Sequence, residues 1–232
     1  VESRRHRDDI KLGRGGIREI EFIVQAFQLL YGGRHTELRQ RPTLTILAEL
    51  EALELLPERD VTRLRTAYLF LRDLENRLQM LDDKQTQRLP EAPEDLAAVA
   101  ASLGRETTAD FLEALDASRD RVQEAFDQTF AAPQTDQPEG EAPLSQLWRG
   151  ALEPGSAAEA LTDYGYLAPE RALETLNQLR QAKFLERLTA TGRERLDRLM
   201  PLLIGAAGQT PAPATALTRM VEVLEAIGGR TT

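Results

Sequence analysis

Cysteine is absent from the 232-residue chain, and histidine occurs only as His6 and His35. Without cysteine the protein can form neither a disulfide framework nor a thiolate metal site, which fits a reducing cytoplasm. Metal-binding and catalytic histidines usually have acidic or histidine partners at helical spacing, and neither of these histidines has a convincing set. These absences exclude the disulfide-rich secreted class and give no support to histidine chemistry.

The chain also lacks long apolar runs and an excess of positive charge. No stretch is long and apolar enough to predict a transmembrane segment, so we expect no membrane partner. The formal net charge is -9 and the pI is near 5.0, which argues against a general nucleic-acid binder. The first residues, VESRRHRDD, contain no starting Met and no apolar signal-peptide core. We therefore expect a segment of a longer chain.

Helical periodicity is what the sequence has in abundance. Apolar residues recur at intervals of three and four in the regular segments, and no stretch alternates as a half-buried strand does. The pattern predicts an all-α fold of helical bundles, with helices over residues 17–30, 43–55, 58–81, 93–103, 108–130, 144–152, 169–188 and 211–227.

One stretch, AAPQTDQPEGEAP, interrupts this periodicity. Proline, glycine and acidic residues dominate it, which is typical of a linker. Chain length alone is compatible with one helical domain or two. The composition favours two helical subdomains: the first over residues 1–131, a linker over residues 132–143, and the second over residues 144–232.

The strongest local signal is KLGRGGIREIEFIVQAFQ, residues 11–28, where a glycine-rich turn runs into an apolar helix. Gly13, Gly15 and Gly16 allow backbone angles that other residues avoid, and cations beside them precede a helix N-terminus. Such a turn is one way to hold a phosphate. Glycines before a helix also serve purely steric needs, and the segment has neither the Walker pattern nor the dinucleotide fingerprint in its usual place.

Two polar stripes run along the predicted helices. One lies on the helix after the turn and the other on the helix over residues 58–81; their members are Arg18, Glu21, Gln25 and Gln28, and Arg72, Glu75, Asn76 and Gln79. The stripes could face each other. Spacing alone favours a solvated face with weak ion pairs for the second stripe.

Beyond these patterns, the residues resemble a known family. DIKLGRGGIREIEFIVQAFQLLYGGR, residues 9–34, and AYLFLRDLENRLQMLDDKQTQRLP, residues 67–90, look like the adenylyl-removing half of the bifunctional glutamine synthetase adenylyltransferases. RERLDRLMPLL, residues 193–203, follows the same order more loosely. A related turn occurs in the PII uridylyltransferases of the same nucleotidyltransferase superfamily, and the equivalent region of such a protein is an alternative.

The resemblance implies a cytoplasmic enzyme with two nucleotidyltransferase halves. One half adds AMP from ATP to a tyrosine of glutamine synthetase, and the other removes it by phosphorolysis, releasing ADP. PII signal protein and glutamine would regulate the balance. The family's combination of a Gly-Ser turn with an Asp-x-Asp pair, which would bind Mg2+, is not found in this chain. We therefore expect this chain to be the helical region that follows the catalytic sheet of the removing half. We expect it to be inactive by itself.

Within the chain, the resemblance points to Lys11 and Arg18 as contacts to an anionic ligand. Gly13, Gly15 and Gly16 would shape the turn. The remaining candidates would orient these cations or reach the catalytic face; they are Glu19, Glu21 and Gln25. The structural alternative is that Arg18 and Glu21 merely pair at i, i+3. At the level of the whole chain, the alternative is a non-catalytic interaction or regulatory module. Interdomain communication is the role we expect for residues 144–227.

Overall fold

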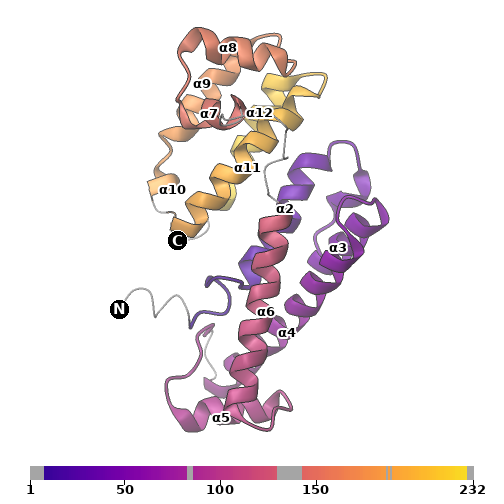
Figure 1. The fold of residues 1–232 in the computed structure, drawn as a ribbon, viewed down its shortest axis with the longest axis vertical. Helices are drawn as coiled ribbons and strands as arrows, with labels where there is room; N and C mark the ends of the chain where they lie inside the picture. The colour runs from indigo at the N-terminus through magenta and orange to yellow at the C-terminus, as the bar shows by residue number, and fades with distance from the viewer. Residues whose placement is uncertain (1–7, 83–85, 130–142, 187, 189, 229–232) are drawn as a thin grey trace. The chain divides into compact units, whose positions relative to one another are not determined.

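The computed structural model of the protein describes residues 8–82, 86–129, 143–186, 188 and 190–228. Across these residues every regular element is a helix and no β-strand is present, which confirms the predicted all-α fold. The helices form two compact units, Val1–Thr129 and Phe130–Thr232 (Figure 1). The predicted linker lies outside the described residues, except for Pro143, which begins a helix. None of the described helices combines the length and the apolar character needed to cross a membrane.

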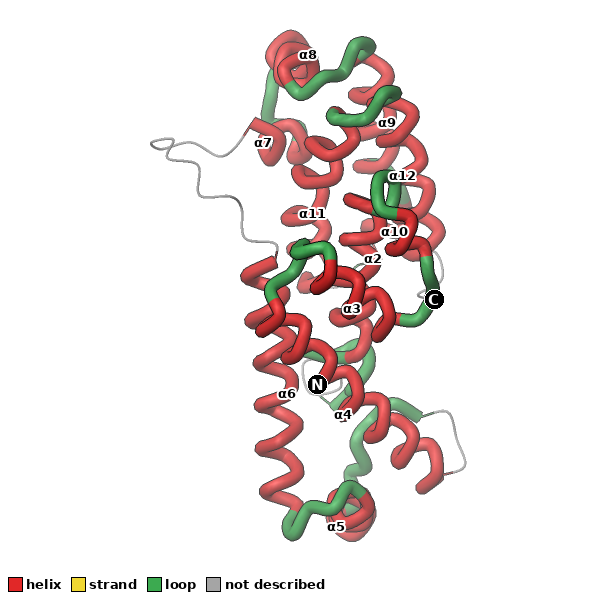
Figure 2. Tube along the Cα trace, turned by 90° about the vertical axis from the view of Figure 1, so that its right-hand side faces the viewer, coloured by secondary structure: helices red, strands yellow, loops and turns green. Residues whose placement is uncertain are grey.

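The first unit is a bundle around its first helix. Its elements are α2 (Ile17–Tyr31), η1 (Thr36–Arg39), α3 (Thr43–Ala52), α4 (Glu58–Asp82), α5 (Pro93–Ser102) and α6 (Thr108–Thr129). Helix α2 contacts α3, α4 and α6, and the long helices α4 and α6 also pack against each other (Figure 2). Burying one large apolar side chain contributes about 1.5–3 kcal/mol. The buried apolar face of α2 therefore anchors it in the bundle through Ile17, Ile20, Ile23, Val24 and Phe27.

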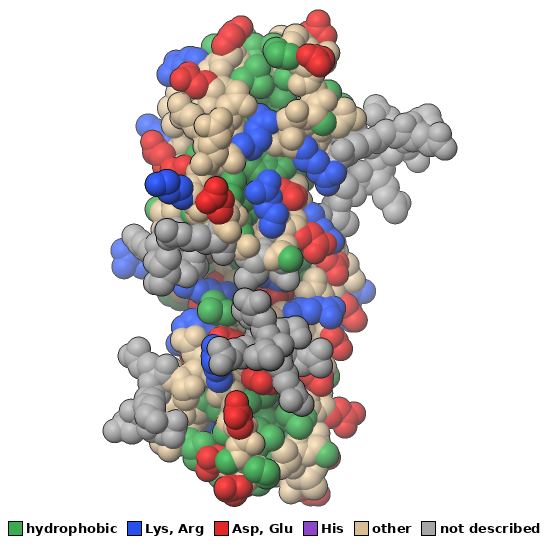
Figure 3. Space-filling view, turned by 90° about the vertical axis from the view of Figure 1, so that its left-hand side faces the viewer, with side chains coloured by type: hydrophobic (Ala, Val, Ile, Leu, Met, Phe, Trp, Pro, Cys, Tyr) green, Lys and Arg blue, Asp and Glu red, His purple; other side chains and the backbone are tan. Residues whose placement is uncertain are grey.

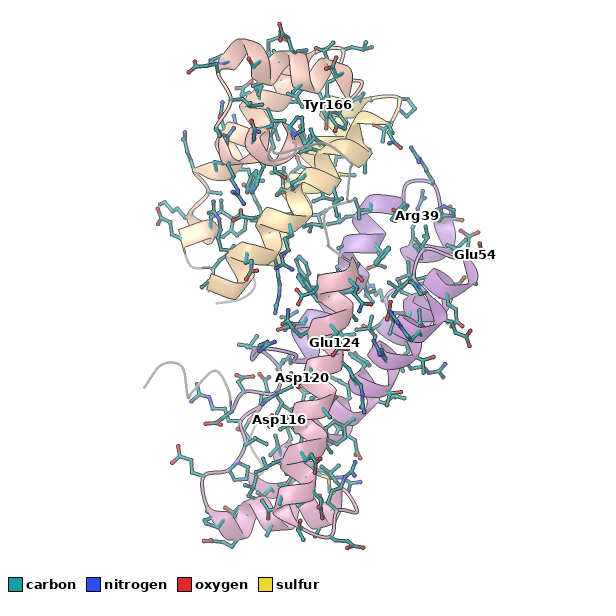
Figure 4. All side chains as sticks on the ribbon, viewed as in Figure 1. Arg39, Glu54, Asp116, Asp120, Glu124 and Tyr166 are labelled. Carbon is teal, nitrogen blue, oxygen red and sulfur yellow. The ribbon has the colours of Figure 1, made fainter. Side chains whose placement is uncertain are left out.

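Helix α3 ends at Ala52, before the predicted end at residue 55. The chain reverses at Glu54, whose φ of 55° lies in the left-handed region (Figure 4). After this reversal, the Leu55 amide donates to the Leu50 carbonyl at 2.9 Å and the Leu56 side chain is buried. Burial of Leu56 ahead of Pro57 thus outweighs the helical preference of the last predicted turn.

The second unit is a smaller group of helices. Its elements are α7 (Pro143–Arg149), α8 (Pro154–Asp163), α9 (Pro169–Arg180), α10 (Lys183–Glu186), α11 (Ala190–Gly208) and α12 (Pro213–Gly228). The predicted helix over residues 169–188 is therefore two helices, because the chain breaks at Gln181 and Ala182.

Two large aromatic side chains lie at the centre of the second unit. Trp148 donates through its indole nitrogen to Asp197 Oδ1 at 2.7 Å. The Tyr166 hydroxyl donates to the Ile204 carbonyl at 2.7 Å, and burial raises the pKa of Tyr166 (Figure 4). Both aromatic side chains are buried with their polar atoms hydrogen-bonded, so they act as packing anchors.

The glycine-rich turn before α2 is held from two sides. On one side, residues 8–10 pair antiparallel with the segment after α4: the Ile10 amide donates to Gln87 O at 2.9 Å, and the Leu89 amide donates to Asp8 O at 3.0 Å. On the other side, Gly15 lies against α6. A Cβ at Gly15 would stand 2.5 Å from both the Cα and the carbonyl oxygen of Arg119.

Steric contacts thus explain why glycine occupies two positions of the turn. Gly15 has a φ of +69°, and no side chain fits between it and the α6 backbone. A Cβ at Gly16 would stand 2.7 Å from the Lys11 carbonyl and 2.8 Å from the Gly13 carbonyl, so Gly16 lets the turn close. Close backbone packing therefore accounts for glycine at both positions.

Gly15→Ala should destabilise the first unit far more than Gly104→Ala. Gly104 has a φ of +70° but nothing within 4 Å of its Cβ position. Gly104→Ala therefore measures only the free-energy cost of placing alanine at a positive φ. That cost is about 1–2 kcal/mol, and the overlap with α6 should add at least about 2 kcal/mol at Gly15. Urea unfolding followed by far-UV circular dichroism measures both. Equal losses for the two variants would contradict the close contact with α6.

Candidate functional site

Asp9 organises the first half of the turn. Its Oδ1 accepts hydrogen bonds from the Lys11 amide at 2.9 Å and the Leu12 amide at 2.8 Å, and its carbonyl accepts one from the Gly13 amide at 3.0 Å. This pattern is an Asx turn, in which a side chain replaces a backbone acceptor. The chain direction at Lys11 is therefore set by Asp9.

The second half of the turn satisfies the amides at the start of α2. The Ile17 amide donates to Ile10 O at 3.1 Å, the Arg18 amide to Lys11 O at 3.1 Å, and the Glu19 amide to Gly16 O at 3.0 Å. The Gly15 amide donates to Glu19 Oε1 at 2.7 Å. Phosphate at a helix N-terminus normally takes such amides. An anion at this turn would therefore be bound by side chains and not by these four amides.

Lys11 forms a charged cluster with α4. Its Nζ lies 3.2 Å from Glu75 Oε1, and Arg72 NH1 lies 2.6 Å from Glu75 Oε2. The Glu75 side chain is only 4% exposed, whereas those of Lys11 and Arg72 are 24% and 45% exposed. The prediction that the second stripe is a solvated face is confirmed for Arg72 and Asn76, which are exposed. It is wrong for Glu75, which is buried. Two cations share one carboxylate, which leaves a net positive charge.

Arg18 belongs to a separate pair on α2. Its NH1 lies 3.3 Å from Glu21 Oε2 at the i, i+3 spacing, which is the geometry of the structural alternative. Its side chain is 41% exposed, and its Nε is buried without a hydrogen-bond partner in the described part of the chain. Arg18 therefore keeps donor capacity that its pair with Glu21 does not use.

The remaining candidates divide between turn and helix. Glu19 is buried and its Oε1 accepts the Gly15 amide; its role in orienting the cations or in reaching the catalytic face stays a prediction. Gln25 is half-buried on α2. Gln28, the last member of the first stripe, donates to the Leu38 and Gln40 carbonyls and so ties α2 to η1. The candidates thus form separate local pairs and not one hydrogen-bonded cluster.

Arg119 is the site residue that sequence reasoning missed. It comes from the middle of α6, and its NH2 lies 3.5 Å from the Asp9 carbonyl. Burial lowers the pKa of Arg119, and the nearby carboxylates of Asp116, Asp8, Asp9 and Glu19 act in the opposite direction. One signal could have found it: Arg119 stands four residues after Leu115 and three before Val122, at a core position of the helical repeat.

The described residues do not fit a magnesium site. No group of three or more His, Asp or Glu side chains that could hold a metal ion occurs within residues 8–82, 86–129, 143–186, 188 and 190–228. Carboxylate and water oxygens are what Mg2+ requires.

Charges of both signs cover the surface. Basic and acidic side chains are interspersed over the face shown in Figure 3. The described residues of that face therefore show mixed charges and not a continuous basic surface.

Comparison with known proteins identifies the family. Residues 2–130, more than half of the chain, match the family model described as GlnD PII-uridylyltransferase. The chain belongs to this family. The match ends next to Thr129, where the first compact unit ends.

Curated relatives of this family member extend the similarity through the second unit. Each is a bifunctional glutamine synthetase adenylyltransferase/adenylyl-removing enzyme. The protein of Thioalkalivibrio sulfidiphilus is 45% identical over 98% of this chain and 24% of its own length. Those of Nitrosococcus oceani and Chromobacterium violaceum are each 44% identical, over 96% and 99% of this chain and 23% and 25% of their own lengths. The resemblance is confirmed, and the chain spans about a quarter of these relatives.

Glu75→Gln should destabilise the first unit by about 2 kcal/mol, because it removes a buried carboxylate that two cations share. Glu21→Gln removes the half-buried partner of Arg18, whose own side chain is 41% exposed, and should cost less than about 0.5 kcal/mol. Urea unfolding of both variants at one salt concentration gives the comparison. A cost for Glu75→Gln no larger than that for Glu21→Gln would show that the Lys11–Glu75–Arg72 cluster does not stabilise the bundle.

Proposed function

We propose that the chain is the helical part of the adenylyl-removing half of a bifunctional glutamine synthetase adenylyltransferase. The observation that carries this proposal is the extent of the similarity. The family model ends at residue 130, but the relatives of that name match 96–99% of the chain and so include the second unit. This extent favours glutamine synthetase as the protein substrate over the PII protein that the family model's description names.

The reaction we propose for the parent protein is phosphorolysis. An oxygen of inorganic phosphate attacks the phosphorus of the AMP group on a glutamine synthetase tyrosine. The bond between that phosphorus and the tyrosine oxygen breaks, so ADP leaves and the tyrosine hydroxyl takes up a proton. The other half of the parent would add AMP from ATP, and PII signal protein and glutamine would regulate the two reactions in the cytoplasm.

Lys11 and Arg18 are the residues of this chain that would act on the reacting anions. Phosphoryl-group transfer depends on cations that neutralise charge on the phosphate oxygens. Lys11 belongs to a cluster with a net positive charge, and Arg18 has a buried Nε without a partner in the described residues. Gly13, Gly15 and Gly16 shape the turn between these cations. Mg2+, held by residues of the parent outside this chain, would supply further charge neutralisation.

The second unit has a different proposed role. Its buried aromatic side chains form packing contacts, and the described part of the unit contains no group of acidic or histidine residues that could hold a metal. We propose that it transmits regulation between the halves of the parent. The competing idea, that the whole chain is a non-catalytic interaction module, shares this role but denies any contact of Lys11 and Arg18 with substrate.

The parent protein should release ADP from adenylylated glutamine synthetase and inorganic phosphate, and the isolated chain should not. The reason is that the chain lacks the family's Asp-x-Asp pair. ADP formation is measured with both proteins at equal concentration, and circular dichroism verifies that the isolated chain is folded. ADP release by the folded, isolated chain would refute its proposed inactivity, and no release by the parent would refute the proposed function.

Lys11→Ala in the parent should raise the KM for phosphate about tenfold, which corresponds to about 1.4 kcal/mol of lost anion binding. Lys183→Ala, a lysine of the second unit, is the matched control and should leave the KM unchanged. Steady-state kinetics at varied phosphate measures the effect, and Lys11→Arg should retain most of the affinity. An unchanged KM in Lys11→Ala would favour the non-catalytic module.

A further inference from the structure

Arg119 occupies the point where α6 touches the glycine-rich turn. The atoms of Arg119 closest to Gly15 are its Cα, Cβ and carbonyl oxygen, which almost every amino acid has. The packing contact therefore does not explain why an arginine stands there. The guanidinium needs a separate explanation, because a buried charge is costly unless it is paired and hydrogen-bonded.

Four carboxylates oppose the effect of burial on the pKa of Arg119, whose NH2 lies 3.5 Å from the Asp9 carbonyl. Asp8 and Asp9 precede the turn, Glu19 follows it, and Asp116 lies one turn earlier on α6 (Figure 4). Arginine remains charged even when burial lowers its pKa, so it offsets one of the four negative charges. Without it, one positive charge fewer would oppose these carboxylates, which lie near the two cations proposed to receive phosphate.

The carboxylates that Arg119 faces are also those that define the turn. Asp9 accepts the amides of Lys11 and Leu12 through its side chain, and its carbonyl accepts both the Gly13 amide and the Arg119 guanidinium. Glu19 accepts the Gly15 amide. Lys11 stands two residues after Asp9, and Arg18 stands one residue before Glu19. A group that binds Asp9 therefore fixes the turn on which Lys11 lies and from which the helix with Arg18 begins.

We propose that Arg119 is a positioning residue of the adenylyl-removing site: it binds the Asp9 carbonyl and so fixes the turn, and its positive charge opposes the carboxylates beside the turn, which keeps the turn accessible to phosphate. This inference rests on the proposed function. Arg119 acts through Lys11 and Arg18 and does not itself contact the reacting atoms. Since it lies 110 residues after Asp9 in the sequence, the site includes α6 as well as the turn and α2.

Substitutions of the Arg119 side chain separate charge from packing. Arg119→Gln and Arg119→Lys both keep the Cα, Cβ and carbonyl that touch Gly15, and both remove the guanidinium fork. Only Arg119→Lys keeps the positive charge. Arg121→Gln removes a positive charge from an exposed position of the same helix and is the matched control.

The experiment measures phosphate-dependent ADP release by the full-length parent enzyme, with adenylylated glutamine synthetase as the second substrate. We expect Arg119→Gln to raise the KM for inorganic phosphate about tenfold with kcat within about twofold, because repulsion weakens anion binding. Arg119→Lys should raise it by less than about threefold, and Arg121→Gln should not change it. The thermal midpoints of the two Arg119 variants should be similar.

The adenylylating activity of the same preparations serves as an internal standard and should be unchanged in each variant. A merely structural role predicts equal losses in Arg119→Gln and Arg119→Lys, tracking their thermal midpoints, and this result would overturn the proposal. So would an unchanged KM in Arg119→Gln. Failure of the proposed function is distinguishable, because the wild-type parent would then release no ADP.

Discussion

The close approach of Gly15 to the backbone of α6 is the constraint on which the candidate site depends. A left-handed glycine without a side chain lets the turn lie against the Cα and carbonyl of Arg119. Only with the turn in this place can the Arg119 guanidinium reach the Asp9 carbonyl, and only then can the Ile10 amide donate to Gln87 O and the Leu89 amide to Asp8 O. The bundle packing and the local hydrogen bonds thus support the same position of the turn.

This constraint also decides what kind of anion site the turn can be. A phosphate-binding loop of the usual type presents free amides at a helix N-terminus. Here the amides of Gly15, Ile17, Arg18 and Glu19 are hydrogen-bonded within the turn. The capacity for anions therefore lies with side chains. Those side chains are held by carboxylates of two helices: Lys11 by Glu75 on α4, and Arg18 by Glu21 on α2.

The comparisons and the structure divide the chain at nearly the same place. The family model ends at residue 130 and the first compact unit ends at Thr129, while the similarity to the named relatives continues through the second unit. The unit that carries the turn is thus shared with the broader family. The second unit accompanies it in the relatives that act, by their name, on glutamine synthetase.

Apolar spacing determined most of the fold without the structure. The helices over residues 17–30, 58–81 and 108–130 agree with α2, α4 and α6 to within a residue at each end, because long amphipathic segments leave little choice of register. The errors lie where burial of a few residues overrides local preference. Helix α3 ends before its predicted end because Leu56 is buried after the turn that follows it. The predicted helix over residues 169–188 breaks at Gln181 and Ala182, between α9 and α10.

The sequence by itself determined the all-α class, the turn, its glycines and its two cations, because these features depend on residues close together in the chain. The tertiary structure alone decided what these residues contact. Glu75 stands 64 residues from Lys11, and Arg119 stands 110 residues from Asp9. Helical spacing marks Glu75 as a member of a polar stripe and Arg119 as a charge at a core position. Whether such a charge faces solvent or a buried partner depends on which helices pack together, and no local pattern contains that information.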